Sequence, residues 1–580
     1  MKDYSFGNNI YELRNARRLS QKELGQKLGV SDKAVSRWEN GSSKPRASLL
    51  PKLAGVLGVS VDRLLGGKGD ATQSIIATAS GDFIDKKYTT DTTDKIRVNF
   101  IPEQGKFAGN YLCTWHTQFA VAKRLNIQGE TVAIRQRNAV NENTLFKEEL
   151  YHPYSRQLRK SLVFLIDDGW DVPKDTGNTD TSPFGAMVPD PEKFASLGNT
   201  DLERLTEISR RVKELGYYGL GVWVSPQRVG LPNIESVEDD RAYWEERATI
   251  SHKAGVVYWK VDWGRNSHTP GYREMMTECV RRCAPGLMIE HAREHEPFNP
   301  DSVNVNNQRV EAMSDRWEYS DFLRTYDVAE PFGDSETFGR TNALLKILDP
   351  KKLRHGAKGF INVESQPLVA AGLSLNLGVM EYSLEDEAAL KWQQICPPYS
   401  AAKGEYQTSS ETVLEHLRFD TNLDHWKRMQ WQDLKFEVPM VASRCAKLPK
   451  VECEGIKPIV LCSSNPETNA LCVSTLRRCI DPNSKVAAPA DVTIYPEGAK
   501  TTVGVFGFYK TLTLEFAEDL PKNIAVWAQC LLDDNAVNVT DKVQIGKNTI
   551  TFDGFYLREL GHKAGESSIA HEPALIIKIF

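Results

Sequence analysis

The sequence predicts a multidomain chain with an all-α head, a (β/α)8 barrel and a C-terminal antiparallel β-sandwich. Three observations lead to this fold class. Apolar residues recur at helical spacing before residue 66. Eight short, apolar, β-rich runs then alternate with helical patterns between residues 110 and 434. From residue 435 onward the strands shorten, apolar and polar residues alternate, and helical patterns fade.

Length and composition limit the class of protein. A chain of 580 residues is too long for one ordinary domain. No apolar run is long enough to cross a bilayer, and the N-terminus lacks the apolar core of a signal peptide, so we expect a cytoplasmic protein with no membrane partner. The ten cysteines form no Cys-x-x-Cys pair, and Cys279 and Cys283 lack further zinc ligands. Reduced core thiols are therefore expected.

Charge is distributed unevenly along the chain. Residues 1–70 contain 13 Lys and Arg against 7 Asp and Glu, whereas the remaining residues contain 59 against 70. A basic head on an acidic body predicts a polyanionic partner for the head only.

The head carries the start and stop signals of short helices. Ser20 with Glu23 forms a capping box at the start of a helix, Gly29 ends it, and Ser31 can cap the next. Two short helices joined by a tight glycine turn are typical of a helix-turn-helix. A further helix is expected around residues 49–57, and Ser60 caps a short fifth one. The expected core residues are Ile10, Leu13, Ala16, Leu24, Leu28, Val35 and Trp38.

The run LSQKELGQKLGVSDKAVSRWENG, residues 19–41, resembles the Cro/C1-type (XRE) helix-turn-helix domains of phage repressors. The resemblance covers the predicted domain 1–66 and implies that residues 31–40 enter the major groove of double-stranded DNA and that two heads act as a dimer. The alternative is a small helical bundle used for protein contacts. By the resemblance, the DNA-binding residues are Gln21 on a phosphate and Ser31, Lys33, Ala34 and Arg37 facing the DNA.

The body is expected to begin after a flexible Gly-rich break at residues 66–70. Residues 67–109 are interpreted as a linker and β lead-in, 110–434 as the (β/α)8 TIM barrel, and 435–580 as the β-sandwich. The eight candidate barrel strands are residues 111–115, 162–166, 217–224, 256–261, 286–290, 318–320, 360–363 and 374–379.

Acidic residues follow three of these strands, where barrel enzymes place their chemistry. Asp167 and Asp168 follow the second strand, Asp262 follows the fourth, and Asp321 follows the sixth. Lys260 precedes Asp262 by two positions, so both side chains should face the lumen. A single Asp after a strand is usually a turn former. Three such strand ends, each near a Trp, favour sugar chemistry, because glycoside hydrolysis needs two carboxyl groups and sugars stack on apolar rings.

These strand ends resemble those of the melibiase-type α-galactosidases, a clan D family of retaining glycoside hydrolases, over residues 110–400. The resemblance implies that Asp262 is the nucleophile and Asp321 the general acid/base in a double displacement, so Asp321 must begin protonated. No cofactor and no metal ion is implied. By the resemblance, the substrate-binding residues are Asp167, Asp168, Trp170, Trp223, Lys260, Glu290 and Trp115.

The sequence departs from the family pattern at several points. Asp327 lies close behind Asp321 and is its rival for the acid/base role. The residues after Glu290 contain no Cys/Gly-rich loop, and Ser225-Pro226 stands where close relatives often place Glu-Pro, which leaves the identity of the sugar open.

Three other polar groups have two interpretations each. Arg316 binds the sugar or forms a structural ion pair, and Arg265 binds substrate hydroxyls or caps its own loop. His291 and His295 lie four residues apart without a zinc motif and are interpreted as loop histidines.

Two classes of function fit these motifs. The first is an exo-acting retaining glycoside hydrolase, most like an α-galactosidase, that cleaves an α-linked oligosaccharide or glycoside and carries a DNA-binding head. The second is a transcriptional regulator whose barrel senses a sugar without cleaving it, so that sugar binding biases DNA binding by linkage. A structural head that does not bind DNA is a third interpretation, disfavoured by the polar character of residues 31–37.

Overall fold

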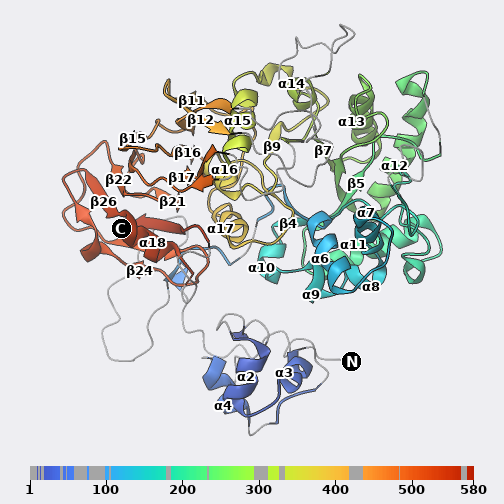
Figure 1. Ribbon diagram of the computed structural model, residues 1–580, viewed down its shortest axis with the longest axis horizontal. Helices are drawn as coiled ribbons and strands as arrows, with labels where there is room; N and C mark the ends of the chain where they lie inside the picture. The colour runs from blue at the N-terminus through green and yellow to red at the C-terminus, as the bar shows by residue number, and fades with distance from the viewer. Residues whose placement is uncertain are drawn as a thin grey trace. The chain divides into compact units, whose positions relative to one another are not determined.

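The chain forms two compact units, one containing the head and the other containing the barrel together with the sandwich. Each unit is described by itself. The computed structural model (Figure 1) describes residues 10, 13–14, 19–39, 43–46, 49–57, 75–76, 98–103, 106–177, 184–230, 234–292, 311, 313–325, 334–416, 435–481, 484–563 and 571–580.

The head contains helices α2 (Gln21–Leu28), α3 (Asp32–Glu39) and α4 (Leu50–Leu57). The predicted capping box is confirmed, since Ser20 Oγ accepts from the Glu23 backbone N–H and the Glu23 carboxylate accepts from that of Ser20. Gly29 ends α2 with a φ of 77°, a left-handed conformation that favours glycine. Ser31 Oγ accepts from Ala34 N at 3.2 Å, as expected of a cap. The helix expected after Ser60 lies outside the described residues.

The core of the head follows from the predicted spacing. Ile10, Leu24, Val35 and Trp38 are buried together with the apolar face of α4. Beside them the buried Arg14 guanidinium pairs with the Glu39 carboxylate, which fixes the end of α3 against the N-terminal segment. Helices α2, α3 and α4 are therefore held together by one shared apolar core.

The barrel is a closed, eight-stranded parallel sheet. Strands follow one another around it in the order β10-β3-β4-β5-β6-β7-β8-β9. A parallel bridge between Asn362 and Asn376 joins the last strand to the first and closes the ring. The strands are β3 (Asn110–Cys113), β4 (Leu162–Ile166), β5 (Gly219–Val224), β6 (Val256–Val261), β7 (Met288–Ala292), β8 (Phe322–Arg324), β9 (Phe360–Asn362) and β10 (Gly378–Val379).

Helices surround these strands (Figure 1). Val212 of α11 and Trp244 of α12 are buried against the outer face of the sheet, so the strands are covered on both faces and are apolar throughout. The helices of the barrel are α6 (Trp115–Arg124), α7 (Val132–Asn138), α8 (Glu142–Leu145), α9 (Glu148–Tyr151), α10 (Arg156–Arg159), α11 (Asp201–Glu214), α12 (Arg241–Ala254), α13 (Tyr272–Cys283), α14 (Met313–Trp317), α15 (Asp334–Leu345), α16 (Pro367–Gly372) and α17 (Leu384–Trp392), with short 3-10 helices η2 (Ala195–Leu197), η3 (Val237–Asp240) and η4 (Pro350–Lys352).

The second half of this unit consists of two sheets packed face to face. Val460 and Val473 of the larger sheet pack against Val492 and Leu512 of the smaller one. The larger sheet has the order β11-β14-β16-β17-β21-β27-β23-β24 and the smaller one β15-β20-β22-β26-β25. The strands are β11 (Tyr406–Thr408), β12 (Thr412–His416), β13 (Lys435–Pro439), β14 (Val441–Arg444), β15 (Lys450–Glu452), β16 (Ile459–Asn465), β17 (Ala470–Leu476), β18 (Arg478–Asp481), β19 (Ser484–Val486), β20 (Asp491–Ile494), β21 (Thr502–Phe506), β22 (Thr511–Glu515), β23 (Val526–Cys530), β24 (Val537–Asn538), β25 (Gln544–Ile545), β26 (Thr549–Asp553) and β27 (Ala574–Ile579), with helices η7 (Thr540–Lys542) and α18 (Gly554–Gly561).

The sandwich differs from the expectation in two details. The pairs β14–β16, β17–β21 and β20–β22 are parallel, so the sheets are mixed rather than wholly antiparallel. Strand β11 pairs with β14, so the larger sheet recruits a strand that precedes residue 435. Short strands β1 (Ile75–Ile76) and β2 (Val98–Asn99) pair ahead of the barrel, and β2 contacts the sandwich through a hydrogen bond from Ala536 N to Val98 O.

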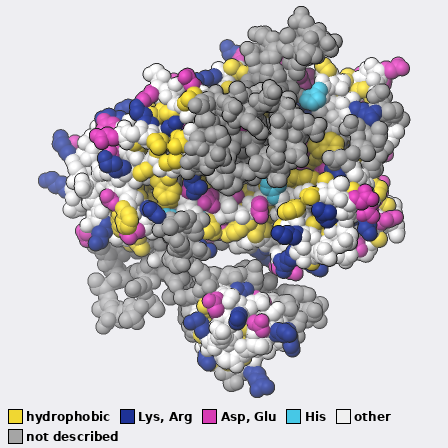
Figure 2. All heavy atoms as spheres, viewed as in Figure 1, with side chains coloured by type: hydrophobic (Ala, Val, Ile, Leu, Met, Phe, Trp, Pro, Cys, Tyr) yellow, Lys and Arg dark blue, Asp and Glu magenta, His cyan; other side chains and the backbone are white. Residues whose placement is uncertain are grey.

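All ten cysteines are free, and seven of them are buried, in agreement with the expected reduced thiols. Within the described ranges, no helix combines the length and apolarity that a bilayer crossing requires. On the face shown in Figure 2, acidic and basic side chains of the described surface are interspersed.

Candidate functional site

The lumen of the barrel is built in two layers. Neighbouring strands are in register, so side chains of paired residues point to the same side of the sheet. The lower layer is apolar and contains Val163, Tyr258, Met288 and Phe322. The upper layer is polar and lies nearer the carboxyl ends of the strands. It contains the paired residues Trp223, Lys260 and Glu290. The sheet register thus gathers charged groups from far apart in the sequence at the carboxyl ends of the barrel strands.

Asp262 follows β6 and lies in this polar layer. Its Oδ1 accepts from Arg324 Nη2 at 2.8 Å, and its Oδ2 accepts from Trp223 Nε1 at 3.0 Å. Both oxygens are therefore oriented by groups on other strands of the barrel, Trp223 on β5 and Arg324 on β8. The Asp262 side chain is 13% exposed, whereas those of Arg324, Lys260 and Asp167 are 4% exposed or less. Asp262 is the member of this group that solvent reaches most.

Lys260 lies in the lumen as expected but pairs with other carboxylates. Its Nζ is 2.9 Å from Asp167 Oδ2 and 3.1 Å from Glu364 Oε1. Burial by itself would lower the pKa of Lys260, and Arg324 acts in the same direction, but Asp167 and Glu364 hold that pKa well above its ordinary value. The cation that contacts Asp262 is Arg324 rather than Lys260.

Glu290 is fully buried at the centre of a hydrogen-bond network. Its carboxylate accepts from the Tyr258 hydroxyl at 2.8 Å and from Asn362 Nδ2 at 2.7 Å. Burial raises the pKa of Glu290, and Arg324 opposes this effect without cancelling it. Arg324 reaches Glu290 Oε1 at 3.5 Å and Glu364 Oε2 at 2.7 Å. One guanidinium therefore joins three carboxylates, which include that of Asp262.

Asp168 is held by a cation that the sequence did not reveal. Arg137 of α7 donates to its Oδ2 at 2.7 Å, and both groups are buried. The close approach requires Gly169, since a Cβ at that position would lie 2.7 Å from the Arg137 Cα and its φ is +116°. Burial raises the pKa of Asp168 despite Arg137. Asp167 and Asp168 thus point to two different cations.

The tryptophans near these acids have different environments. Trp170 and Trp223 are 1% and 0% exposed, so neither offers a free ring face to a sugar. Trp170 Nε1 donates to the Trp223 carbonyl at 2.9 Å. Trp115 is the first residue of α6 rather than the end of a strand, and it packs half-buried on the luminal cluster. The structure therefore assigns Trp223 a contact with Asp262 in place of the expected stacking surface.

Asp321 lies at the opposite end of the barrel from Asp262. The predicted strand 318–320 is wrong, because β8 begins at Phe322, and Asp321 therefore precedes the strand instead of following it. Its oxygens accept from Arg281 Nη1 and Nη2 at 3.0 and 2.9 Å and from Ile289 N at 3.0 Å. The structure does not bring Asp321 and Asp262 together. Asp327 lies outside the described residues.

Arg316 and Arg265, each of which has two interpretations from the sequence, have different surroundings. Arg316 is buried, donates to the carbonyls of Ala292 and Ser267 and pairs with Glu311, which is a structural arrangement. Arg265 is half-buried, and its backbone N–H donates to Gln227 Oε1 at 2.8 Å.

His291 faces away from the lumen. Its Nε2 lies 2.9 Å from Thr277 Oγ1, and burial lowers its pKa well below the ordinary value. His295 lies outside the described residues. In the part of the chain that the structure describes, no group of three or more His, Cys, Asp or Glu side chains could hold a metal ion.

The candidate DNA-facing residues differ in their exposure. Ser31, Lys33 and Arg37 are exposed, while Ala34 is half-buried against the core. Gln21 Nε2 donates to Glu39 Oε2 at 2.7 Å, so the buried Arg14–Glu39 pair orients this side chain.

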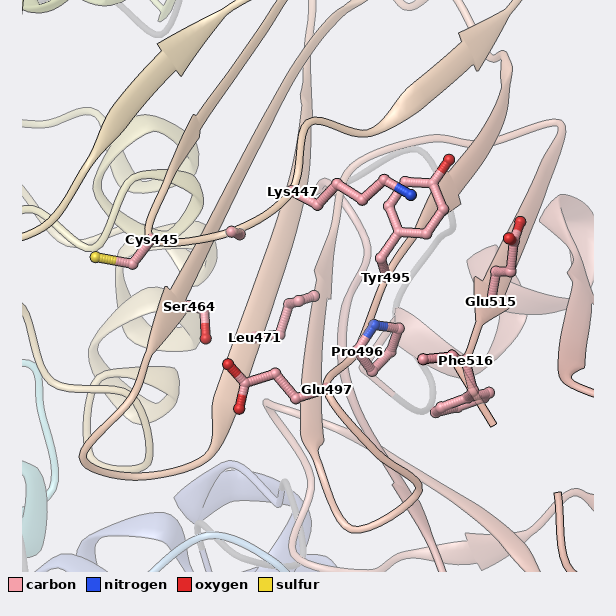
Figure 3. Close-up of a pocket in the computed structure, with 11 residues that line it drawn as sticks. Cys445, Lys447, Ser464, Leu471, Tyr495, Pro496, Glu497, Glu515 and Phe516 are labelled. Atoms are coloured by element: carbon pink, nitrogen blue, oxygen red, sulfur yellow. The ribbon is translucent and has the colours of Figure 1, made fainter. Parts of the chain in front are cut away.

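Two hollows lie outside the lumen. One of about 320 Å³ lies in the sandwich, where the Lys447 ammonium sits over the Tyr495 ring, 3.6 Å from its centroid (Figure 3). Another, of about 250 Å³, is lined by Ser365 and Pro367 of the barrel and by Arg477 of the sandwich. Neither contains Asp262 or Lys260, so the larger hollow does not mark the charged cluster described above.

Comparison with known proteins identifies the head. The model of the family described as Helix-turn-helix matches residues 10–64. Residues 10–64 form a helix-turn-helix domain. HTH-type transcriptional activator BcrR of Enterococcus faecalis is 29% identical over 109 residues, which are 18% of this chain and 53% of that protein. Uncharacterized HTH-type transcriptional regulator YqaE of Bacillus subtilis is 32% identical over 70 residues, 12% of this chain and 59% of that protein. The chain thus spans little more than half the length of these curated relatives.

Solved structures resemble the helix-turn-helix domain and the larger unit separately. The P22 c2 repressor bound to a synthetic operator is 35% identical, with 11% of this chain and 96% of that chain covered and a TM-score of 0.11. A GH27-b-L-arabinopyranosidase of Geobacillus stearothermophilus is 8% identical, with 82% and 96% covered and a TM-score of 0.35. Alpha-galactosidase I of Mortierella vinacea is 11% identical, with 83% and 98% covered and a TM-score of 0.33.

Sequence reasoning missed three charged residues of the lumen. Arg324 is the last residue of β8, and the misplaced strand concealed it. Glu364 lies two residues after β9, and an acid just after a predicted strand is a signal that could have revealed it. Arg137 lies in a helix far from any strand end, and no local signal marks it. In the helix-turn-helix domain, by contrast, the capping box at Ser20 and the helix end at Gly29 lie where the sequence predicted them.

Proposed function

We propose that the barrel is a retaining, exo-acting glycoside hydrolase in which Asp262 is the nucleophile. The observation that carries this proposal is the environment of Asp262. Both of its oxygens are oriented by hydrogen bonds, and it is the most exposed carboxylate of a charged cluster at the carboxyl ends of the strands. A nucleophile needs this combination, because it must be held in place and still reach the anomeric carbon.

The proposed reaction is a double displacement. Asp262 attacks the anomeric carbon while a general acid protonates the leaving oxygen, and water then hydrolyses the glycosyl-enzyme with the same residue acting as base. We assign this acid/base role to Asp327, because Arg281 holds Asp321 at the other end of the barrel. Asp167, Lys260 and Glu290 are proposed to bind sugar hydroxyls, and an α-galactoside is the proposed substrate. The reaction requires no cofactor.

The helix-turn-helix domain is proposed to bind double-stranded DNA as a dimer through α3, which places the protein in the cytoplasm. Exposed Lys33 and Arg37 beside the helix cap supply the positive charge and the base-reading groups that such an interface needs. Selection of binding sites from random duplexes tests this proposal. Arg37→Ala should weaken binding to the selected site by about 1–3 kcal/mol and relax specificity at one base position.

A second candidate function is a sugar-sensing regulator. The sequestration of Asp321 favours it, because the described lumen then lacks the acid that the sequence predicted. A helix-turn-helix domain on a sugar-binding barrel would couple the two ligands through the preferred dimer arrangement.

Hydrolysis of a panel of nitrophenyl α- and β-glycosides by the purified chain separates the two functions. Turnover of the α-galactoside that disappears in Asp262→Asn supports the enzyme. Turnover of another glycoside supports the mechanism and contradicts the substrate. A sugar that raises the melting temperature of the protein without cleavage of any glycoside supports the sensor.

A further inference from the structure

The tryptophans around Asp262 differ in whether a ring face and an N–H group are free to contact a ligand. Trp223 is buried, and its N–H is bonded to Asp262. Trp170 is buried as well, and its N–H is bonded to a backbone carbonyl. A sugar that reaches Asp262 therefore needs another apolar surface.

Trp263 directly follows Asp262 and has the opposite character. It is half-buried, and its ring centroid lies 5.6 Å from that of Trp223 and 5.1 Å from that of Phe184, with tilted planes. Within the described chain its indole N–H donates to no group, in contrast to those of Trp170 and Trp223. Part of this ring and its donor are therefore available to a ligand.

The backbone of Trp263 is fixed. Ser225 Oγ donates to its carbonyl oxygen at 3.0 Å, and a Cβ at the following Gly264 would lie 2.5 Å from the same hydroxyl oxygen. Phe184 and Trp223 are fully buried and pack against the ring. Trp263 is thus a rigid aromatic surface, and such a surface binds a ligand at a small cost in conformational entropy.

We propose that Trp263 contacts the pyranose ring of the substrate bound at Asp262, an inference that rests on the proposed function. The C–H groups of one pyranose face pack on the indole, and the N–H donates to a hydroxyl of the sugar. The tilted contact between Trp263 and Trp223, whose N–H reaches Asp262, places this surface beside the nucleophile. Trp263 is in this way a substrate-binding residue that helps to select the sugar.

The test compares Trp263→Ala and Trp263→Phe with the unchanged protein. The probes are 4-nitrophenyl α-D-galactopyranoside, 4-nitrophenyl β-L-arabinopyranoside, which lacks the hydroxymethyl group, and free D-galactose bound by the Asp262→Asn protein in calorimetry. Removal of the ring should raise KM for the preferred glycoside and Kd for galactose about tenfold, with kcat changed less than threefold, because the contact is present in both ground and transition states. Trp263→Phe keeps the apolar face and should lose less affinity.

Phe555→Ala is the matched control, since it removes an aromatic ring that is 67% exposed on the sandwich. It should leave KM and Kd unchanged. Trp263→Leu takes the place of Trp263→Ala if the alanine variant does not fold. Unchanged KM and Kd in the variants that lack the ring would overturn the role of Trp263 while leaving the proposed hydrolase intact. A wild-type chain that neither cleaves the glycosides nor binds galactose would overturn both proposals.

Discussion

At the carboxyl ends of the barrel strands Arg324 holds Asp262 at 2.8 Å, and at the amino ends Arg281 holds Asp321 at 2.9 Å. The two ion pairs have the same chemistry. They differ in the surroundings of the carboxylate. Asp321 also accepts a hydrogen bond from a backbone N–H, and its side chain is 1% exposed, whereas that of Asp262 is 13% exposed. The Asp–Arg pair at the carboxyl ends of the strands thus leaves its carboxylate partly open to solvent, while the pair at the amino ends joins helix α13 to the sheet.

The largest effect is expected for Asp262→Asn, which keeps the shape of the side chain but removes its charge. Loss of the nucleophile should reduce kcat/KM by more than about 10³-fold. Arg324 loses one of three carboxylate contacts and keeps the other two, so the fold should persist. Circular dichroism and steady-state kinetics on the best glycoside check this. Activity within tenfold of wild type would exclude Asp262 as the nucleophile.

Asp327→Ala sharpens the comparison by testing the acid/base that a nucleophilic Asp262 requires. If Asp327 is the acid/base, glycosides with poor leaving groups should lose about 10²–10⁴-fold in kcat, and nitrophenyl glycosides, whose leaving group needs little protonation, should lose less in the first step. The ratio of the two losses is the measurement. Equal rates in wild type and variant for both kinds of leaving group would return the acid/base role to another carboxyl group.

Asp321→Asn tests the other end. Asp321 is buried and its partner Arg281 is partly exposed, so removal of the charge should lower the free energy of unfolding by about 1–3 kcal/mol. The rate per folded molecule should stay the same, because Asp321 is distant from Asp262. Urea unfolding and active-site titration separate the two quantities, and Glu278→Gln on the same helix, a partly exposed carboxylate, is the control. A large fall in kcat without a loss of stability would contradict the structural role.

Asp171 is a buried carboxyl group whose contribution to stability should depend on pH. It follows Trp170, its Oδ1 has no hydrogen-bond partner in the described structure, and burial raises its pKa from 3.8 to about 7, although the Met187 N–H opposes this. The folded state therefore keeps a proton that the unfolded state has lost. Stability from this group is present below about pH 4 and is lost as pH rises to 7.

Asp171→Asn should accordingly stabilise the protein at pH 8 by at most ~4 kcal/mol and much less at pH 4. Melting temperatures at the two pH values give the measurement. Asp519→Asn, an exposed carboxylate on the sandwich, should show little change at either pH. A stabilisation that is the same at pH 4 and pH 8 would mean that the Asp171 carboxyl is not the source.

Local patterns predicted much of this protein. The capping box at Ser20 and the turn at Gly29 are written within a few residues of sequence, and both are confirmed. Strands β4 and β6 coincide with the predicted residues 162–166 and 256–261, because strands buried on both faces are continuous apolar runs. The lumen-facing positions of Lys260 and Asp262 followed from the two-residue period of a strand.

The position of β8 could not be predicted in the same way. The segment from Glu318 to Arg324 contains polar residues at both ends, and its sequence alone does not say which of them precede the strand. Register with β7, which pairs Glu290 with Phe322, decides the matter and sends Arg324 into the lumen. Pairing with β7, rather than local propensity, therefore leaves Asp321 before the strand and Arg324 within it.

The sequence by itself determined the helix-turn-helix domain, the alternation of strands and helices and the acids that follow β4 and β6, because each depends on residues a few positions apart. Only the tertiary structure decided which charges meet. Arg324, Glu364 and Arg137 come from a strand, a strand end and a helix that are separated along the chain, and the packing of the closed barrel brings them to Asp262, Lys260 and Asp168. Electrostatic partners in a buried site are set by distance in space, which a linear pattern does not record.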